Sequence, residues 1–129
     1  MSNSSEIMLE GTAFLITETD LKGVIKFANS EFCKTTGYKY KELIGKAHNI
    51  VRHPDMPNTV FESLWGTISK GKTWTGCIKN KTRNGDFYWC FATIFPHSLD
   101  SELSGYISCR RKATNDEIST YKKFYERWQ

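Results

Sequence analysis

Apolar residues recur with two different spacings along the chain, and the change of spacing separates strands from helices. Continuous or alternating runs of apolar and β-favouring residues, bounded by turn residues, predict strands. Such runs occupy residues 13–19, 24–28, 73–80, 87–95 and 103–111. Asn84 and Gly85 form a strong hairpin signal, and Pro96 is expected to end the fourth strand. Because two strands alone are only marginally stable, the five are expected to form one antiparallel sheet.

Helical spacing occurs in the middle and at the end of the chain. The clearest stripe contains Val60, Phe61, Leu64, Trp65 and Ile68. Asp55 is a candidate N-cap for this helix. Two single helical turns are expected at 31–35 and 40–44, and a final helix that starts at Thr114 or Asn115 carries Ile118, Tyr121, Phe124, Tyr125 and Trp128 on one side. The order of elements predicts an α+β fold: a five-stranded antiparallel sheet with short helices and one longer helix on one face, followed by a C-terminal helix.

The fourth predicted strand is apolar on both faces. Tyr88, Cys90, Ala92 and Ile94 share one face, and Phe87, Trp89, Phe91 and Phe95 share the other. An antiparallel sheet with one face in water alternates apolar with polar residues. The second face is therefore expected to be covered by the terminal helix, by the first ten residues or by a second subunit.

Small residues lie among large ones on the first of these faces. Cys90 and Ala92 are small, and the neighbouring strand offers Gly76 between Trp74 and Asn80. A glycine inside a strand often marks the close approach of a ligand or of another backbone. Two interpretations stay open. One is a cavity with an aromatic wall and an amide, which would suit a planar heterocycle; the other is a filled core in which Trp74 is simply packed.

The composition limits the class of protein. The 129 residues are 39% hydrophobic and 14% aromatic, which fits one globular domain. The net charge of +4 is mild and no recognition helix accompanies the basic clusters, so nucleic acid is not expected as a partner. Without a secretion signal or an apolar run of roughly 20 residues, no direct membrane insertion is expected, and we predict a cytoplasmic location. The four cysteines have no CxxC spacing, so no metal site is expected.

The most unusual stretch is 45–57, with the sequence GKAHNIVRHPDMP. Its two prolines restrict the backbone around Arg52, His53 and Asp55, which predicts a stiff turn that displays charged side chains. We call residues 52–57 the elbow. The elbow is either a ligand contact or an ordinary loop whose aspartate caps the next helix. No nucleophile and base occur at convincing spacing, so an enzyme is not expected.

Together these features resemble the PAS domain family over residues 13–113. The order of elements, Asn29 after the second strand, the TGY at 36–38, the ELIG at 42–45 and Asn84-Gly85 carry the general resemblance. The stretches 48–57, 71–76, 79–81 and 84–89 are similar, more specifically, to the PAS domains of aerotaxis receptors. This resemblance implies non-covalently bound FAD and a redox or oxygen signal. It also implies a chemotaxis signalling partner, a HAMP or methyl-accepting module in cis or in trans.

The resemblance further implies which residues contact the cofactor. They are Arg52, His53, Asp55, Trp65, Trp74, Asn80 and Cys90. The amide of Asn80 would match the donors and acceptors of the flavin pyrimidine edge, and an arginine at a helix start can pair with pyrophosphate. Photoactive relatives carry a reactive cysteine ahead of the elbow, but residues 47–52 contain none, so light-driven adduct chemistry is not expected. Their signalling glutamine falls near Arg110.

The chain is expected to divide into an N-terminal cap or flexible segment (1–12), the sensor domain (13–113) and a C-terminal signalling or linker helix (114–129). A homodimer through the outer sheet face or the terminal helices is expected. Two alternatives to flavin stay open. One is a haem-binding gas sensor with His48, His53 or His97 as the axial ligand. The other is a cofactor-free module whose apolar sheet face binds a second copy or a partner.

Overall fold

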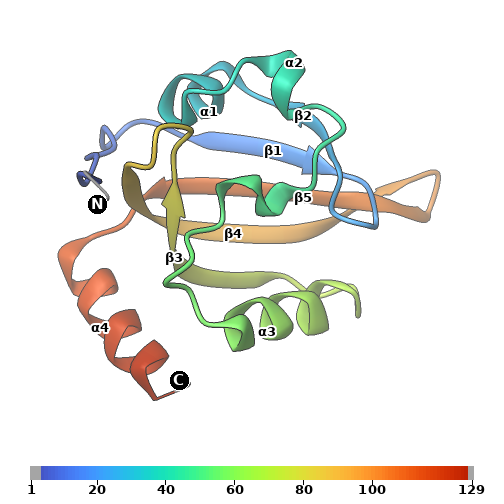
Figure 1. The fold of residues 1–129 in the computed structure, drawn as a ribbon. Helices are drawn as coiled ribbons and strands as arrows, with labels where there is room; N and C mark the ends of the chain where they lie inside the picture. The colour runs from blue at the N-terminus through green and yellow to red at the C-terminus, as the bar shows by residue number, and fades with distance from the viewer. Residues whose placement is uncertain (1–3, 128–129) are drawn as a thin grey trace.

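The computed structural model describes residues 4–127 and contains one five-stranded antiparallel sheet in that range (Figure 1). The elements are β1 (Leu15–Thr19), β2 (Ile25–Ala28), α1 (Ser30–Thr36), α2 (Tyr40–Leu43), the 3-10 helix η1 (His48–Val51), α3 (Asn58–Ile68), β3 (Trp74–Lys81), β4 (Phe87–Leu99), β5 (Glu102–Lys112) and α4 (Asn115–Glu126). The strand order is β2-β1-β5-β4-β3. Because β1 pairs with β5, the first hairpin joins the sheet of the last three strands, as predicted.

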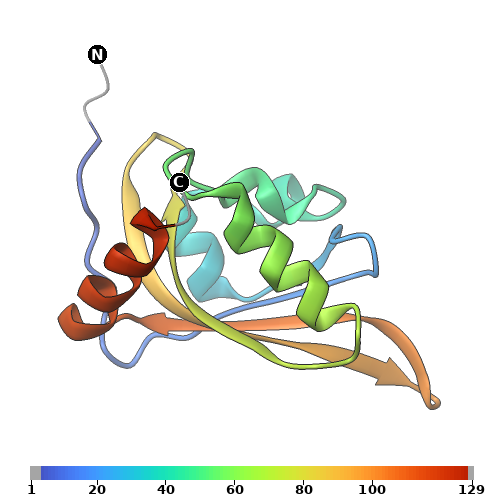
Figure 2. The same ribbon diagram turned by 90° about the horizontal axis from the view of Figure 1, so that it is seen from below.

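The helices divide between the two faces of the sheet (Figure 2). Helices α1, α2 and α3 lie over one face, which we call the inner face, and α4 packs on the opposite, outer face. A ring contact between Trp65 and Tyr106 joins α3 to the inner face, and one between Tyr121 and Phe91 joins α4 to the outer face. The predicted α+β fold with a C-terminal helix is confirmed.

Local sequence explains several element boundaries. The side chain of Asn29 accepts a hydrogen bond from the amide of Phe32 at 3.0 Å and so caps α1. Gly37 ends α1 in the left-handed conformation, at a φ of 80°. Thr114 caps α4 and forms a reciprocal capping box with Glu117. Trp128, which was predicted on the apolar side of this last helix, lies outside the described residues.

Two predicted boundaries are wrong. Pro57 occupies the N-cap position of α3, so Asp55 does not cap that helix. Strand β4 does not end at Pro96 but continues to Leu99 and stays paired with β5. The pairing between β3 and β4 begins at Trp74, so the far end of β4 has a neighbour on one side only. A proline is tolerated there because its missing N–H can face away from the paired strand.

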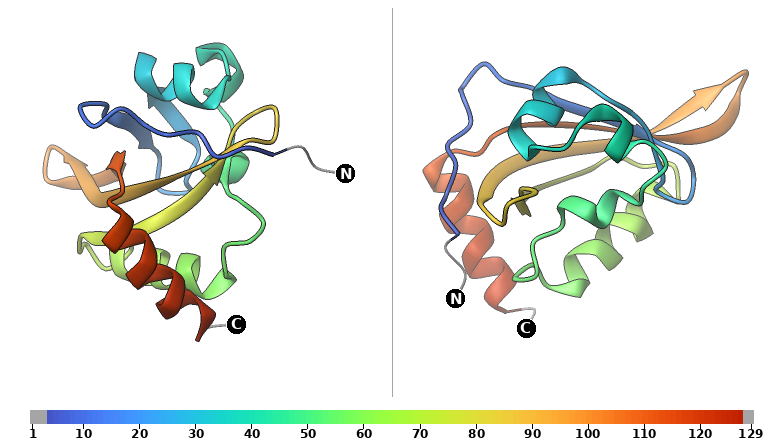
Figure 3. Two further views of the ribbon diagram at one scale, coloured as in Figure 1. Left: turned by 90° about the vertical axis from the view of Figure 1, so that its left-hand side faces the viewer. Right: turned by 45° about the horizontal axis from the view of Figure 1, so that its top comes forward.

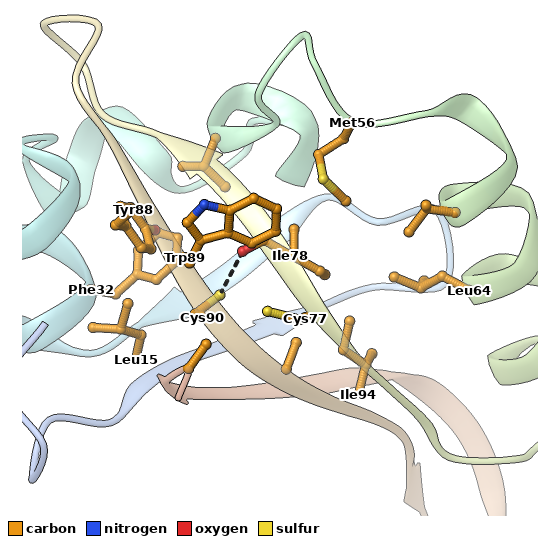
Figure 4. Packing of buried hydrophobic residues seen from close by; sticks show 14 of the residues in the cluster. Leu15, Phe32, Met56, Leu64, Cys77, Ile78, Tyr88, Trp89, Cys90 and Ile94 are labelled. Atoms are coloured by element: carbon orange, nitrogen blue, oxygen red, sulfur yellow. Dashed lines mark hydrogen bonds between the residues drawn. The ribbon is translucent and has the colours of Figure 1, made fainter. Parts of the chain in front are cut away.

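The strand register determines which side chains meet on the inner face. Two neighbouring rows of Cα partners cross the sheet: Trp74, Ile94, Ser108 and Thr17 form one, and Gly76, Ala92, Arg110 and Leu15 form the other. Apolar side chains from β3 and β4, with others from α1 and α3, build the buried core between sheet and helices (Figure 4). Strand β5 contributes the polar side chains of Ser108 and Arg110 to the same face, and both are buried.

The outer face of β4 is covered from within the chain. Tyr125 of α4 donates a hydrogen bond to the carbonyl of Cys77, and the Arg111 guanidinium lies 4.5 Å from the centroid of the Phe91 ring. Glu6 forms a parallel bridge with Phe87. Figure 3 shows α4 lying along this side of the sheet, while the hairpin between β4 and β5 projects beyond the other elements. Of the three predicted covers, the terminal helix and the N-terminal residues therefore both contribute, and a second subunit stays a prediction.

Candidate functional site

A cavity of about 250 Å³ lies between the inner face of the sheet, the segment 47–52 and helix α3. Its wall combines apolar side chains from α3 with polar side chains from the strands. The lining residues are Thr19, Lys22, Gly23, Ala47, His48, Asn49, Val51, Arg52, Phe61, Leu64, Trp65, Ile68, Asn80, Ile94, Tyr106, Ser108 and Arg110. Pockets that bury a drug-sized ligand usually measure about 300–1,000 Å³. The cavity therefore suits one ring system better than a whole dinucleotide.

The floor of the cavity is a polar group formed by Asn80, Ser108 and Arg110. Arg110 Nε donates to Ser108 Oγ at 2.9 Å. With the amide oriented to satisfy both of its polar atoms, Asn80 Oδ1 accepts from Arg110 Nη1 at 2.7 Å and Asn80 Nδ2 donates to the Val51 carbonyl at 3.2 Å. Arg110 is only 5% exposed and Asn80 2% exposed. A side-chain network at this depth fixes the orientation of the groups that face the cavity.

His48 stands beside this floor, at the start of η1. Its Nε2 lies 2.9 Å from Thr17 Oγ1, and its ring makes an edge contact with Phe32. Burial, and then the positive charge of Arg110, lower the pKa of His48 to about 3. The imidazole is therefore neutral at physiological pH.

The mouth of the cavity is aromatic and basic. The Arg52 guanidinium lies 3.8 Å from the centroid of the Phe61 ring and donates to Asn58 Oδ1 at the start of α3. The Trp65 ring lies edge-on to Tyr106, with centroids 5.6 Å apart, and is 39% exposed. Its predicted place in the helical stripe would have buried it in the core. Instead it reaches across the mouth and lies 3.0 Å from where a side chain at Gly23 would begin.

The other two charged residues of the elbow point away from the cavity. Lys79 Nζ lies 3.1 Å from Asp55 Oδ2, and this hydrogen bond lowers the pKa of Asp55. The amide of Asp55 donates to His53 Nδ1 at 3.0 Å, and the His53 ring makes an edge contact with Phe87. Burial lowers the pKa of His53. The structure thus brings Arg52 to the cavity and directs His53 and Asp55 towards the edge of β3.

Trp74 and Cys90 project from the inner face but do not line the cavity. The Trp74 indole covers Gly76 so closely that a methyl group there would collide with it. At Gly76 the filled-core interpretation is therefore correct. Cys90 is fully buried next to Asn80 and its thiol lies 3.7 Å from the Ile78 carbonyl (Figure 4). Burial raises the pKa of the Cys90 thiol to about 11, which keeps it protonated.

The charge of the lining is one-sided. Lys22, Arg52 and Arg110 contribute three cationic side chains, and none of the lining residues is an aspartate or glutamate. Within residues 4–127 no carboxylate forms an ion pair with Arg110, and no cluster of histidine, cysteine and acidic residues could hold a metal ion. Such a lining fits an organic ligand that is electron-rich or anionic, with a planar part between α3 and the sheet.

Sequence reasoning missed most of the cavity floor. Tyr106 and Ser108 were not predicted as lining residues, His48 was considered only as a haem ligand, and Arg110 was considered at this site only as the place of a glutamine in relatives. Tyr106, Ser108 and Arg110 follow one another at every second position of β5, so alternation already indicated that they share a face. What the alternation could not show is that this face looks into a cavity.

These features define a PAS domain. The family model for the PAS fold matches residues 25–108, more than half of the chain, and the chain belongs to this family. It is 43% identical to the aerotaxis receptor of Escherichia coli (strain K12) over 112 residues, which are 87% of this chain and 22% of the receptor. The predicted similarity to aerotaxis-receptor PAS domains is confirmed. The nitrogen fixation regulatory protein of Klebsiella pneumoniae is 28% identical over 105 residues, 81% of this chain and 21% of that protein.

Solved structures with the same fold include domains of the light-oxygen-voltage class. One, from work with a flavin analogue, has a TM-score of 0.74 and 19% identity, and the match covers 90% of this chain and 87% of that one. The dark structure of the blue-light photoreceptor Aureochrome1 LOV has a TM-score of 0.71 and 19% identity over 87% of this chain and 86% of that one. At this identity the likeness shows the fold alone.

The chain spans about a fifth of the length of the two relatives named above. No helix within residues 4–127 is long and apolar enough to cross a membrane.

Proposed function

We propose that this chain is a flavin-binding sensor module that takes FAD into the cavity and reports redox state or oxygen to a chemotaxis signalling partner. The observation that carries the proposal is the cavity itself, which combines an amide and a guanidinium on its floor with an aromatic, basic and acid-free mouth. The similarity to an aerotaxis receptor supports the same ligand class.

The donor groups of the cavity fit a flavin. The pyrimidine edge of the ring alternates donors and acceptors, and the Asn80 amide presents both kinds of atom in the floor. Arg110 adds donors without any acceptor, which suits the ring carbonyls. Arg52, at the mouth, has the geometry and charge to pair with the pyrophosphate. The rest of FAD would extend out of the cavity past this residue, because the volume suits the ring system alone.

The seven residues implied by the resemblance take different roles in this proposal. Arg52, Trp65 and Asn80 would contact the cofactor, because they line the cavity. Cys90 would support Asn80 from behind, and Trp74 would fill the core over Gly76 without touching the cofactor. His53 and Asp55 would hold the shape of the elbow through Lys79 and Phe87.

When bound, FAD would supply reversible electron transfer, and its reduction changes the charge of the ring. The residues around it would bind and orient the ring and sense that change through hydrogen bonds. No catalytic group is required, so the proposed module is a sensor and not an enzyme. We further propose that the module works in the cytoplasm, alone or attached to an inner-membrane receptor. The resemblance favours a HAMP or methyl-accepting partner in cis or in trans.

An absorption spectrum tests the proposal. The purified protein, or the protein refolded with FAD, is expected to show flavin bands that bleach with dithionite and return in air. FAD should stay with the protein through gel filtration and be released as FAD on denaturation, which separates it from FMN. A colourless protein that binds no FAD after refolding would overturn the proposal. A Soret band would favour the haem alternative.

We further propose that residues 1–12 act as a cap, 13–113 as the sensor domain and 114–129 as the signalling or linker helix. The outer sheet face or the terminal helices would form a homodimer. Sedimentation equilibrium on the purified protein tests this, and a monomer at tens of micromolar concentration would argue against it.

A further inference from the structure

The guanidinium of Arg110 is a buried positive charge that has no negative partner among residues 4–127. It is 5% exposed, and its hydrogen-bond partners, Ser108 and Asn80, are both neutral. An unpaired charge in a protein interior costs several kcal/mol, so buried arginines are normally paired with carboxylates. These bonds use two of its five N–H donors, a further one interacts with the Cys90 thiol, and the side chain lines the cavity. The fold therefore maintains a costly charge at the place where a ligand would lie.

No ionisable group around the cavity can neutralise this charge. The lining contains no carboxylate, and the neighbouring His48 is neutral, with a pKa of about 3. Cys90 is held in its thiol form, and burial likewise keeps the Tyr88 hydroxyl protonated by raising its pKa. The remaining source of negative charge is the ligand itself.

We propose that Arg110 supplies the counter-charge for a reduced flavin and so sets the reduction potential of the site. This inference rests on the proposed flavin binding and goes beyond it. Reduction would add two electrons, which dithionite donates in the experiment below, and one proton from water, and would leave one negative charge on the pyrimidine side of the ring. A nearby guanidinium in a dry site stabilises that charge more than it stabilises the neutral oxidised ring. Arg110 thereby favours the reduced form.

The neighbours of Arg110 explain why an arginine serves here. Ser108 binds Nε and Asn80 binds Nη1, so the planar fork is held from two sides. The same bond to Asn80 turns the amide nitrogen towards Val51. Arg110 thus also positions Asn80. Asn80 and the ligand would compete for hydrogen bonds from the guanidinium, and a change in the charge of the ring would alter this competition.

The test compares midpoint potentials of FAD-loaded proteins. Arg110→Gln and Arg110→Met remove the charge, and methionine also removes the cost of burying a polar group. Arg110→Lys keeps the charge and loses the fork. Arg83→Gln is the matched control, because it makes the same change at an exposed arginine that pairs with Glu42 and does not line the cavity. Each protein is titrated with dithionite against a dye of known potential, and bound FAD is counted from its absorbance.

At a given potential, the ratio of reduced to oxidised FAD is expected to be at least tenfold lower in the neutral variants than in wild type. This corresponds to a fall in midpoint potential of about 30 mV or more. The lysine variant should stay within threefold of wild type, and Arg83→Gln should have the wild-type midpoint. Loss of FAD from both neutral variants, with the lysine variant loaded, also supports a required charge.

Two results would overturn the inference while flavin binding stands. One is a neutral variant that is fully loaded and has the wild-type midpoint. The other is a lysine variant whose midpoint falls as far as that of the neutral ones, because geometry and not charge would then matter. A wild-type protein that binds no FAD would overturn both this inference and the function on which it rests.

Discussion

Asn80 links the inner face of the sheet to the elbow. Its side chain bonds Val51 and Arg110, and its backbone forms a bridge with Arg52. A flavin edge that bonds the amide would therefore be held by groups that are already ordered. Such preorganisation raises affinity because little freedom is lost on binding.

Replacing this amide should weaken FAD binding. Asn80→Ala removes the bonds to the ring and leaves Arg110 with one fewer partner, so we expect the affinity to fall about tenfold, from a loss of about 1.4 kcal/mol. Fluorescence titration of the apoprotein with FAD measures it. Asn84→Ala is the control, because Asn84 lies in the exposed β3–β4 turn, where its side chain bonds Thr82 and Asp86, and does not line the cavity. Equal affinities in the two variants would argue against contact between Asn80 and the flavin.

His48 makes the fold sensitive to acid. Its pKa of about 3 in the folded protein lies well below the 6.5 of a free histidine, so the unfolded chain takes up the proton first as the pH falls. The contribution of His48 to the unfolding free energy is therefore fully present above pH 6.5 and is lost as the pH falls from 6.5 to 3. Between pH 7.5 and 5 this one group should cost about 2 kcal/mol of unfolding free energy.

Urea unfolding at both pH values, with wild type and His48→Gln, measures the effect. Other groups titrate in both proteins and cancel in the difference, so the wild type should lose about 2 kcal/mol more than the variant. Equal losses would mean that His48 takes up a proton in the folded protein as readily as in the unfolded chain.

At the level of single residues, the sequence predicted Arg52 and Asn80 in the cavity, but it did not predict which side chains would surround them there. Arg110 and Ser108 come from a strand almost 30 positions later in the chain, and only the register of β5 against β4 brings them to Asn80. His53 and Asp55 were grouped with Arg52 because they are neighbours in sequence. The proline between them turns the chain, and Lys79 holds Asp55 at the edge of β3.

At the level of elements, α4 is attached to the outer face by a small number of identifiable contacts. Arg111 and Glu117 form a two-point ion pair at 2.9 and 2.8 Å, and this bonding lowers the pKa of Glu117 to about 2. Tyr125 bonds the carbonyl of Cys77. A helix held this way can leave the sheet without unfolding the core beneath the inner face.

Removing the ion pair should loosen α4. Glu117→Gln keeps an acceptor for the capping box with Thr114 but loses the charge that pairs with Arg111. We expect a loss of up to about 1 kcal/mol in local stability, seen as roughly fivefold faster hydrogen exchange in residues 115–126. Glu126→Gln makes the same change of charge at the other end of the helix and should leave this exchange rate unchanged. Equal rates in both variants would show that the ion pair does not hold the helix.

Apart from η1, the types and order of elements could be predicted because their signals are local. Caps at Asn29 and Thr114 and the stripe of α3 depend on residues a few positions apart. The length of β4 could not be predicted, because whether Pro96 ends a strand depends on which neighbours flank it. The stripe of α3 likewise marked a buried side, but it did not show that Trp65 would be partly exposed at the mouth of the cavity, against Tyr106.

On the scale of the whole molecule, β3 connects the cavity to α4. Asn80 projects from its inner face into the cavity floor. From the outer face of the same strand, the Cys77 carbonyl accepts from Tyr125 and Lys79 pairs with Asp55 of the elbow. A change in the bonds of Asn80 therefore acts on a strand to which both α4 and the elbow are attached. An equilibrium between docked and loosened α4 can report the redox state only if the two forms of the flavin stabilise the two positions unequally.

This coupling predicts that reduction changes the exposure of α4. We expect hydrogen exchange in residues 115–126 of the FAD-loaded protein to differ between air and dithionite by at least twofold, while the core strand β5 changes less. Tyr125→Phe removes the hydroxyl that bonds Cys77 and should shrink the difference, because the strand then has a weaker hold on the helix. Tyr40→Phe, at an exposed site on α2, is the matched control and should retain it. Identical exchange of α4 in both redox states, in a protein whose flavin is demonstrably reduced, would mean that the signal leaves the domain by another surface.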